Sequence, residues 1–245
     1  MTFETIQFSV SDNVAHVVLN RAEAGNAINL TMATELLQVA NACRDNEQIG
    51  AVLLSANGPI FCAGGDLKFL ESLGKDLKKG VRAMTRTFHQ VIAVLSNMDA
   101  PVVAAVNGAA AGGGLAIALM SSIVVASVNA RFVASYSRVG ITPDCGFSYF
   151  LPRHVGLRVA EEMLLSNRMV EASEAQTLGM VNEVVAHDLL MDRALEIAKK
   201  LAAGPTHAFG ATRRLLLQSM DASLQEQLDR EAECVLAMME KVVFD

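Results

Sequence analysis

Residues 101–120, PVVAAVNGAAAGGGLAIALM, decide the fold of this chain. The stretch opens with β-branched residues, and Gly108 interrupts it too soon for a helix, so a short buried strand is predicted. It then passes through alanines into Gly112-Gly113-Gly114 and continues as an uncharged helical run to Met120. Glycines ahead of a helix leave backbone N–H groups uncovered at the positive end of the helix dipole. Such a turn favours bound negative charge, either a phosphate or an oxyanion.

The surroundings of the glycine triplet favour the oxyanion. No Gly-Lys-Ser/Thr follows it, as a P-loop requires, and the spacing is not that of the dinucleotide-binding G-x-G-x-x-G motif. Residues 101–130 carry no charge, but Asn107 and three serines interrupt them and no lysine or arginine cluster flanks them. We therefore expect a buried strand–turn–helix–strand unit and no membrane span.

Length and composition limit the class of protein. The 245 residues are enough for a large α/β domain with a smaller helical part, and 52% of them are apolar. The net charge of −6 argues against a nucleic-acid partner. The four cysteines lack metal-ligand spacing, and the first ten residues do not form a secretory signal. We expect a cytoplasmic protein with reduced thiols and no metal site.

Strand and helix patterns alternate in the first part of the chain. Strands are predicted at residues 4–10, 14–19, 49–54, 122–128 and 131–135, and helices at 30–45 and 80–97. After a glycine- and proline-broken loop at 140–146, helical patterns dominate, at 157–166, 172–178, 188–203, 206–218 and 222–240. This order predicts an α/β core followed by a C-terminal helical lobe.

A second glycine turn, Ala63-Gly64-Gly65-Asp66, also leads into a predicted helix. If the sheet brings the two turns together, two backbone N–H groups can point at one carbonyl oxygen, which stabilises an enolate or a tetrahedral oxyanion. Apolar residues nearby suggest an acyl pocket, or equally a helix-packing core: Phe69, Leu70, Met84 and Phe88. The basic residues Lys75, Lys78, Lys79 and Arg82 indicate either a solvated surface or a docking point for a polyanionic cofactor tail.

The sequence resembles the crotonase superfamily, the enoyl-CoA hydratases and isomerases, from about residue 5 to 240. The matching motifs are Leu19-Asn20-Arg21, Asn26-Ala27-Ile28-Asn29, residues 61–67 (FCAGGDL), residues 101–108 with the glycine triplet, and residues 140–146. The resemblance implies a spiral of ββα turns that binds acyl-CoA over residues 1–190 and a helical trimerisation region over residues 191–245. It also implies a homotrimer or hexamer, with coenzyme A present as part of the substrate and no other cofactor.

The resemblance also assigns roles to residues. The oxyanion donors would be the backbone N–H groups of Gly65 and Gly113. Substrate contacts would come from Arg21, Ala24, Ala27, Ala63, Asp66, Leu67, Lys68 and Ala116. Ala116 and Tyr136 occupy the positions of the two glutamates that the family's hydratases use. Neither residue can activate water as a carboxylate pair does, so the two-glutamate hydration mechanism is not expected.

Asp144 matches the position where several isomerases of the family keep a catalytic aspartate. A carboxylate in an apolar pocket can take a proton at one carbon beside a thioester enolate and return it at another. Pro-Asp is also ordinary turn or helix N-cap sequence. Our main hypothesis is enoyl-CoA double-bond isomerisation with Asp144 as acid and base. Hydration of a special enoyl-CoA, with Asp144 replacing the glutamates, is the alternative.

His89, within Phe88-His89-Gln90, supports a third hypothesis. The motif is similar to one in the 4-chlorobenzoyl-CoA dehalogenase branch, where the histidine is a base and an aspartate at the Asp144 position is the nucleophile. That branch has a phenylalanine at the position of Gly65 and a tryptophan at that of Tyr136. A histidine on a core helix can equally be packed and hydrogen-bonded without a catalytic role. A catalytically silent homologue that binds a partner or RNA remains the non-enzyme alternative.

Overall fold

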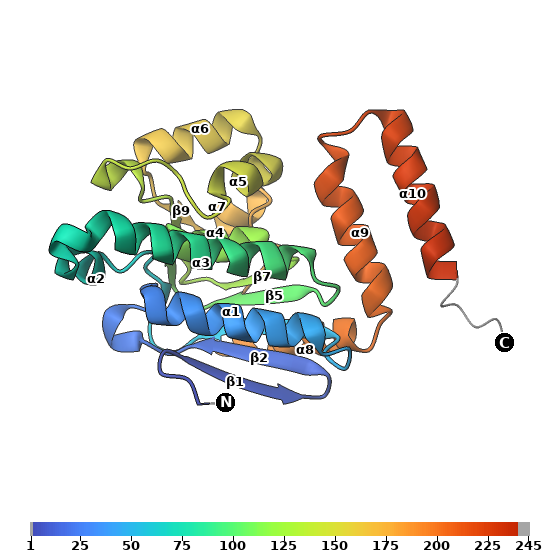
Figure 1. Cartoon of the computed structure of the whole chain (residues 1–245), viewed down its shortest axis with the longest axis horizontal. Helices are drawn as coiled ribbons and strands as arrows, with labels where there is room; N and C mark the ends of the chain where they lie inside the picture. The colour runs from blue at the N-terminus through green and yellow to red at the C-terminus, as the bar shows by residue number, and fades with distance from the viewer. Residues whose placement is uncertain (1, 240–245) are drawn as a thin grey trace.

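The computed structural model describes residues 2–239 and contains two β-sheets covered by helices (Figure 1). The large sheet has the strand order β1 (Ile6–Ser11), β2 (Val14–Leu19), β3 (Ala51–Ala56), β5 (Val102–Val106), β7 (Ile123–Ser127), β10 (Glu183–Val185). Only its β1–β2 pair is antiparallel. The small sheet has the order β4 (Ile60–Cys62), β6 (Ala109–Ala111), β8 (Arg131–Val133), β9 (Val170–Glu171), with β9 antiparallel to β8.

The chain builds these sheets as a spiral. It passes three times from a strand of the large sheet to a strand of the small sheet, in the pairs β3–β4, β5–β6 and β7–β8. Helices follow each pair: α2 (Leu67–Ser72) and α3 (Leu77–Asn97), then α4 (Gly113–Met120), then α5 (Phe147–Val155). The predicted α/β class with a ββα spiral core is therefore confirmed. In each repeat, a turn connects the strand of the small sheet to the helix that follows. Residues of all three turns line the candidate site.

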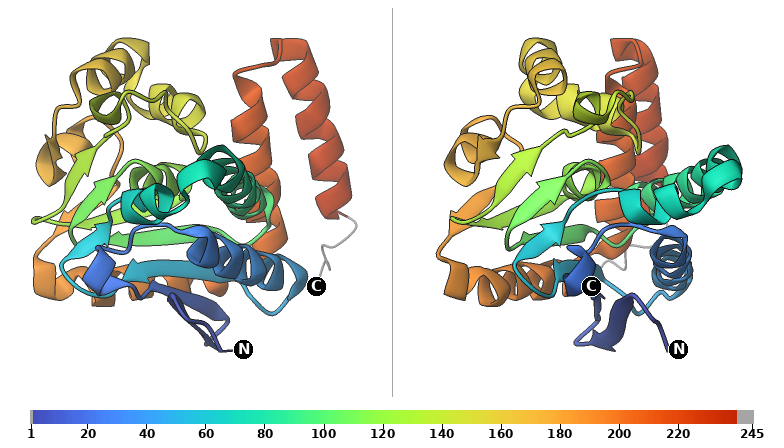
Figure 2. Two further views of the ribbon diagram at one scale, coloured as in Figure 1. Left: turned by 60° about the vertical axis from the view of Figure 1, so that its left-hand side comes forward. Right: turned by 90° about the vertical axis from the view of Figure 1, so that its left-hand side faces the viewer.

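Helices cover both faces of the large sheet because its central strands are apolar on both sides. Val52 and Leu54 of β3 share one core cluster with α1 (Leu30–Asp45) and α3. Leu53, between them, belongs to a second cluster with Leu190 and Ala194 of α8 (Leu190–Ala202). Successive strand residues point to opposite faces, which explains this alternation. Figure 2 shows α8 on the side of the sheet opposite α1.

The two last helices stand apart from this body as an antiparallel hairpin, α9 (Thr206–Ser219) and α10 (Leu224–Met239) (Figure 1). Arg213 of α9 anchors the hairpin by donating hydrogen bonds to the backbone carbonyls of Leu95, Met98 and Ala100. Burial lowers the pKa of Arg213 to about 10, so the guanidinium remains charged at neutral pH. Helix α8 packs against the large sheet, so the helices that project from the body of the protein begin with α9. The division of the chain at residue 190 stays a prediction.

The helices predicted after residue 146 form close to their predicted bounds, but this part of the chain also contains elements that were not predicted. The remaining helical elements are α6 (Leu157–Ser166), α7 (Ala172–Thr177) and the 3₁₀ turns η1 (Ala22–Ala24), η2 (Gly74–Asp76), η3 (Ser137–Val139) and η4 (His187–Leu189). The prediction of helices alone in this part was wrong, since β9 and β10 also form. Both strands have three residues or fewer, too few to show a period. Helix α5 was not predicted; it contains Pro152, a residue that normally argues against a helix.

The last predicted helix, 222–240, matches α10 up to Met239, and its final residue lies outside the described part of the chain. Within residues 2–239, no helix combines the length and the apolar character that crossing a membrane requires. The uncharged stretch from residue 101 to 130 is divided among β5, β6, α4 and β7, as its interruptions indicated.

Candidate active site

The structure brings the two glycine turns side by side. Gly64 and Gly112 both have positive φ, +92° and +47°, which L side chains rarely adopt. A Cβ on Gly64 would lie 2.9 Å from the carbonyl oxygen of Ala111, immediately before the triplet. A Cβ on Gly112 would in turn lie 3.8 Å from the Cα of Gly64. The close approach excludes a side chain at Gly64, whereas at Gly112 the positive φ is what favours glycine.

Each turn contains a glycine N–H for which the described residues provide no acceptor, namely that of Gly65 and that of Gly113. In the bridge between Ile28 and Gly65, the Ile28 N–H donates to the Gly64 carbonyl and the Asp66 N–H donates to the Ile28 carbonyl. The Gly65 N–H is thereby left without a backbone acceptor among the described residues. Gly113 is the first residue of α4, where an N–H has no partner within the helix. Both glycines line one cavity of about 350 Å³, so two free donors border the same space.

The rest of the cavity lining is largely apolar. It comes from the first loop, from the glycine turn after β4, from α2 and α3, and from the segment after β8, namely Ile28, Ala63, Leu67, Leu70, Val81, Met84, Phe88, Ala134, Tyr136, Val139 and Ile141. Within the described part of the chain, Asp144 and Arg138 are the charged residues of this lining. Leu70, Met84 and Phe88 therefore face the cavity as the acyl-pocket hypothesis required, whereas Phe69 is not part of the lining.

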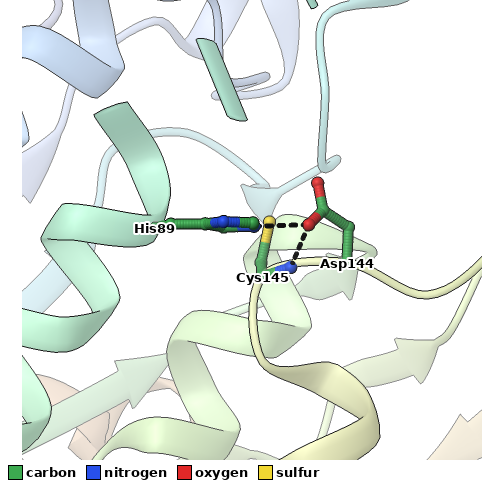
Figure 3. Close-up of side chains that lie close together, drawn as sticks. All are labelled: His89, Asp144 and Cys145. Atoms are coloured by element: carbon green, nitrogen blue, oxygen red, sulfur yellow. Dashed lines mark hydrogen bonds and ion pairs between the residues drawn. The ribbon is translucent and has the colours of Figure 1, made fainter. Parts of the chain in front are cut away.

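Asp144 is held by three neighbours, two of which are drawn in Figure 3. Its Oδ1 lies 2.5 Å from Nε2 of His89 and accepts a hydrogen bond of 2.7 Å from the Cys145 backbone N–H. The Thr85 hydroxyl lies 3.5 Å from Oδ2. His89 and Thr85 come from α3, while Cys145 and Gly146 follow Asp144 with positive φ of 58° and 76°. The carboxylate is 34% exposed and oriented chiefly through Oδ1, so Oδ2 is the freer oxygen.

Tyr136 stabilises the loop that carries Asp144. Its hydroxyl donates a 3.2 Å hydrogen bond to the backbone carbonyl of Asp144, and its ring packs edge-on against Phe147 with centroids 5.4 Å apart. Burial, together with the nearby Cys145 and Asp144, raises the pKa of Tyr136 above its usual value. Burial likewise raises the pKa of the Cys145 thiol. Both groups therefore stay protonated at neutral pH, and neither can serve there as a base.

Arg21 and Asp66 join the first loop to the second glycine turn. The Arg21 guanidinium donates to the Ala27 carbonyl at 2.6 Å and pairs with Asp66 at 2.9 Å. Asp66 also caps α2 by accepting from the Phe69 N–H at 3.0 Å. Burial by itself would raise the pKa of Asp66, but the Phe69 N–H and the Arg21 charge outweigh it and hold the pKa below its usual value. These contacts position Gly65, which immediately precedes Asp66.

The predicted site residues fall into two groups. Gly65, Gly113, Asp144, Tyr136, Ala63 and Leu67 line the cavity. Outside the lining are His89, which contacts Asp144, and the remaining predicted substrate contacts Arg21, Ala24, Ala27, Asp66, Lys68 and Ala116. Ala116 has no exposed surface and is enclosed within α4, so the structure does not bring its side chain to the cavity. The catalytic and binding roles of both groups remain predictions.

Sequence reasoning missed several residues of the lining. Thr85, Arg138, Val139, Ile141 and Cys145 all border the cavity. Val139 and Ile141 flank Gly140, at the start of the recognised 140–146 motif, so two apolar residues on either side of a glycine were the available signal.

The ligand atoms of His89, Asp144 and Cys145 lie within 4.8 Å of one another, the grouping of side-chain types that binds metals. Burial raises the pKa of the Cys145 thiol, which opposes the thiolate form in the absence of a metal. Oδ1 of Asp144 is also already engaged by His89 and by the Cys145 N–H. These contacts fit a hydrogen-bonded carboxylate better than a metal centre.

Comparison with known proteins matches this architecture. The profile of the enoyl-CoA hydratase/isomerase family fits residues 9–243. This chain belongs to that family. Among its relatives, it is 32% identical to 4-chlorobenzoyl coenzyme A dehalogenase-2 of Arthrobacter sp., over 93% of this chain and 83% of the relative. It is 33% identical to 1,2-epoxyphenylacetyl-CoA isomerase of Escherichia coli, over 94% of this chain and 88% of that relative.

A solved structure of the family has the same fold. The enoyl-CoA hydratase/isomerase of Cupriavidus metallidurans superposes with a TM-score of 0.90 at 35% identity, covering 98% of this chain and 89% of that one. The predicted membership of the crotonase superfamily is thus confirmed, and the chain is an acyl-CoA enzyme of this family. The two relatives are named for different reactions, so the choice of reaction depends on the residues of this site.

Proposed function

We propose that this enzyme moves the double bond of an enoyl-CoA, with Asp144 carrying the proton. One observation supports this proposal above the others. Among residues 2–239, Asp144 is the one carboxylate that lines the cavity bordered by the free N–H groups of Gly65 and Gly113. A proton acceptor and an oxyanion site therefore face the same space, as removal of a proton near a thioester requires.

The steps follow from these positions. The thioester carbonyl oxygen accepts hydrogen bonds from Gly65 and Gly113, which acidifies the C–H bond at the α carbon. The Asp144 carboxylate takes the α proton of a 3-enoyl-CoA, and the C–H electron pair forms the dienolate that the two N–H groups stabilise. The resulting Asp144 carboxylic acid returns the proton to the γ carbon, which leaves a 2-enoyl-CoA and the original carboxylate. His89, bonded to Oδ1, orients the carboxylate so that Oδ2 is free to move the proton.

The lining supports isomerisation over hydration. Ala116 and Tyr136 stand at the hydratase glutamate positions; Ala116 is buried, and Tyr136 is a neutral phenol bonded to the Asp144 backbone. No second carboxylate among the described lining residues is available to hold a water beside Asp144. The surrounding apolar side chains also disfavour an ordered water at the acyl chain.

A second candidate function is supported by the 2.5 Å contact between His89 and Asp144. In this case a carboxylate oxygen of Asp144 attacks a ring carbon of an aryl-CoA, and the substituent leaves with its bonding electron pair. Water then hydrolyses the aryl ester while His89 accepts the proton of that water. The difference from isomerisation is a covalent intermediate on Asp144.

Both candidates are tested by incubating the enzyme in heavy water with 3-enoyl-, 2-enoyl- and halogenated aryl-CoA thioesters and following the products by mass. We expect the 3-enoyl substrates to become 2-enoyl products of the same mass or carrying one added deuterium. A product whose mass exceeds that of the substrate by one molecule of heavy water would establish hydration instead. Loss of halide from an aryl substrate, with no turnover of enoyl substrates, would establish the nucleophilic reaction.

A further inference from the structure

Arg138 is the one cation among the described residues that line the cavity. Arg138 is exposed, and within residues 2–239 its guanidinium takes part in no ion pair. Arg82, Arg86, Arg158 and Arg230 are unpaired there as well, but none of these four lines the cavity. An arginine is charged at any physiological pH and presents a planar fork of N–H donors. An unpaired guanidinium beside apolar side chains therefore indicates a binding position for an anion.

The surroundings of Arg138 indicate which part of a ligand reaches it. Arg138 lies in η3, two residues after Tyr136, and is followed by Val139 and Ile141, which are 49% and 57% exposed although they line the cavity. On the helices α2 and α3, Leu67 and Val81 are also exposed lining residues. Methylene groups of an acyl chain would cover these apolar side chains, and a polar end would meet the guanidinium.

We propose that Arg138 binds a carboxylate at the far end of the acyl group, so that the preferred substrates are ω-carboxy-enoyl-CoA thioesters. The inference rests on the proposed function, because that function places the thioester at Gly65 and Gly113. A second carboxylate near Asp144 would be repelled in an apolar cavity unless a cation offsets its charge. Arg138 supplies that cation and can bind a carboxylate through two parallel hydrogen bonds.

Binding of saturated, unreactive thioesters tests this inference without turnover. Succinyl-, glutaryl-, adipyl- and pimelyl-CoA are compared by calorimetry with the monocarboxylic acyl-CoA of the same chain length. At one length we expect the diacid thioester to bind about tenfold more tightly, a typical gain for a charge-assisted pair near the surface. Because the backbone of Arg138 lies at one position along the cavity wall, this preference should peak at that length, and it should weaken in high salt.

Two variants assign the preference to Arg138. Arg138→Met keeps the aliphatic part of the side chain but removes the charge. Diacid and monocarboxylic thioesters of the same length should then bind with about equal affinity, and the affinity for the monocarboxylic thioesters should not change. Arg158→Met is the matched control, because Arg158 is an exposed arginine on the neighbouring α6 that does not line the cavity. The control should retain the full diacid preference.

Three outcomes would overturn the inference or the proposal beneath it. Equal affinity for diacid and monoacid thioesters at every length would reject the role of Arg138 and leave the isomerase proposal intact. An equal loss of affinity for all thioesters and for free coenzyme A in Arg138→Met would show that the guanidinium meets the coenzyme phosphates instead. Absence of binding by any thioester would reject the proposed function itself.

Discussion

Nε2 of His89 lies 2.5 Å from Oδ1 of Asp144, a contact between α3 and a loop residue 55 positions later in the chain. Oδ1 also accepts a hydrogen bond from the Cys145 N–H, so this carboxylate oxygen has two partners. Oδ2 has only the 3.5 Å contact with the Thr85 hydroxyl among the described residues. A carboxylate held in this way has a defined orientation. In the isomerase mechanism, His89 is therefore a positioning residue for Asp144.

His89→Ala is expected to lower kcat by less than about 10²-fold, below the usual range for loss of a general acid or base. The variant removes a hydrogen bond that orients Asp144 but leaves the carboxylate in place. His89→Gln, which can still donate to Oδ1, should recover part of the rate. A loss in His89→Ala as large as that in Asp144→Asn, together with an ester on Asp144 detected by mass spectrometry, would favour the nucleophilic mechanism.

The sequence was sufficient for the parts of the site that depend on local motifs. The glycine turns around Gly64 and Gly113 and the carboxylate of Asp144 lie in recognisable segments, and all of them border the cavity. The resemblance to the dehalogenase branch assigned His89 and Asp144 to one site, but local sequence patterns do not predict their direct contact, which depends on how α3 packs beside the 140–146 loop. The exposed side of η3, with Arg138, was missed because a single turn of three residues has no periodicity.

Gly113→Pro tests the oxyanion donor. Proline is tolerated at the first position of a helix, which is the position of Gly113 in α4, so the change deletes the N–H without interrupting the helix, although its ring also crowds Ile28. Loss of one donor should lower kcat about 10²–10³-fold, or about 3–4 kcal/mol of transition-state stabilisation. Circular dichroism must show an intact fold. A folded Gly113→Pro enzyme with full activity would remove this residue from the mechanism.

Gly113→Ala is the matched control for that variant, because it keeps the N–H. Its Cβ would lie 3.0 Å from Cδ1 of Ile28 and 3.6 Å from Cε1 of Phe88, so the flexible end of Ile28 has to shift by a few tenths of an ångström. We expect a smaller loss of rate than in Gly113→Pro. Equal losses in the two variants would assign the effect to crowding rather than to the donor.

Asp66→Asn should destabilise the fold by about 1 kcal/mol at neutral pH, because asparagine can still cap α2 but cannot pair with Arg21. The folded-state pKa of Asp66 is lowered, so its contribution is complete above the unfolded-state pKa of about 3.9. The contribution disappears as the pH falls through the lower folded-state pKa. Urea unfolding of both proteins should therefore show a difference that narrows below about pH 4.

Asp45→Asn provides the control for this series. Asp45 pairs with Arg44 on the surface, and its carboxylate is 64% exposed. We expect little change in stability, because such exposed pairs contribute little. A stability difference between wild type and Asp66→Asn that stays constant down to pH 2.5 would contradict the role of the Arg21 pair.

The C-terminal hairpin leads to a prediction of assembly. Helix α10 has no buried residue, and its exposed apolar side chains include Leu224, Leu228, Val235, Leu236 and Met239. Apolar surface of this kind on a projecting helix favours contact with other copies of the chain. We predict a homotrimer or hexamer, measured by light scattering, and a smaller mass for a Leu228→Glu/Leu236→Glu variant. A monomer of 26.1 kDa at micromolar concentration would refute the prediction.

The most direct test of the mechanism is the isomerisation rate of Asp144→Asn on a 3-enoyl-CoA. Asparagine keeps the size and shape of Asp144 but cannot accept the proton from the α carbon. We predict that kcat falls by about 10²–10⁴-fold, while the affinity for a saturated acyl-CoA measured on the same preparation remains close to that of the wild type. An Asp144→Asn enzyme that binds normally and retains a near-normal kcat would contradict the assignment of proton transfer to Asp144.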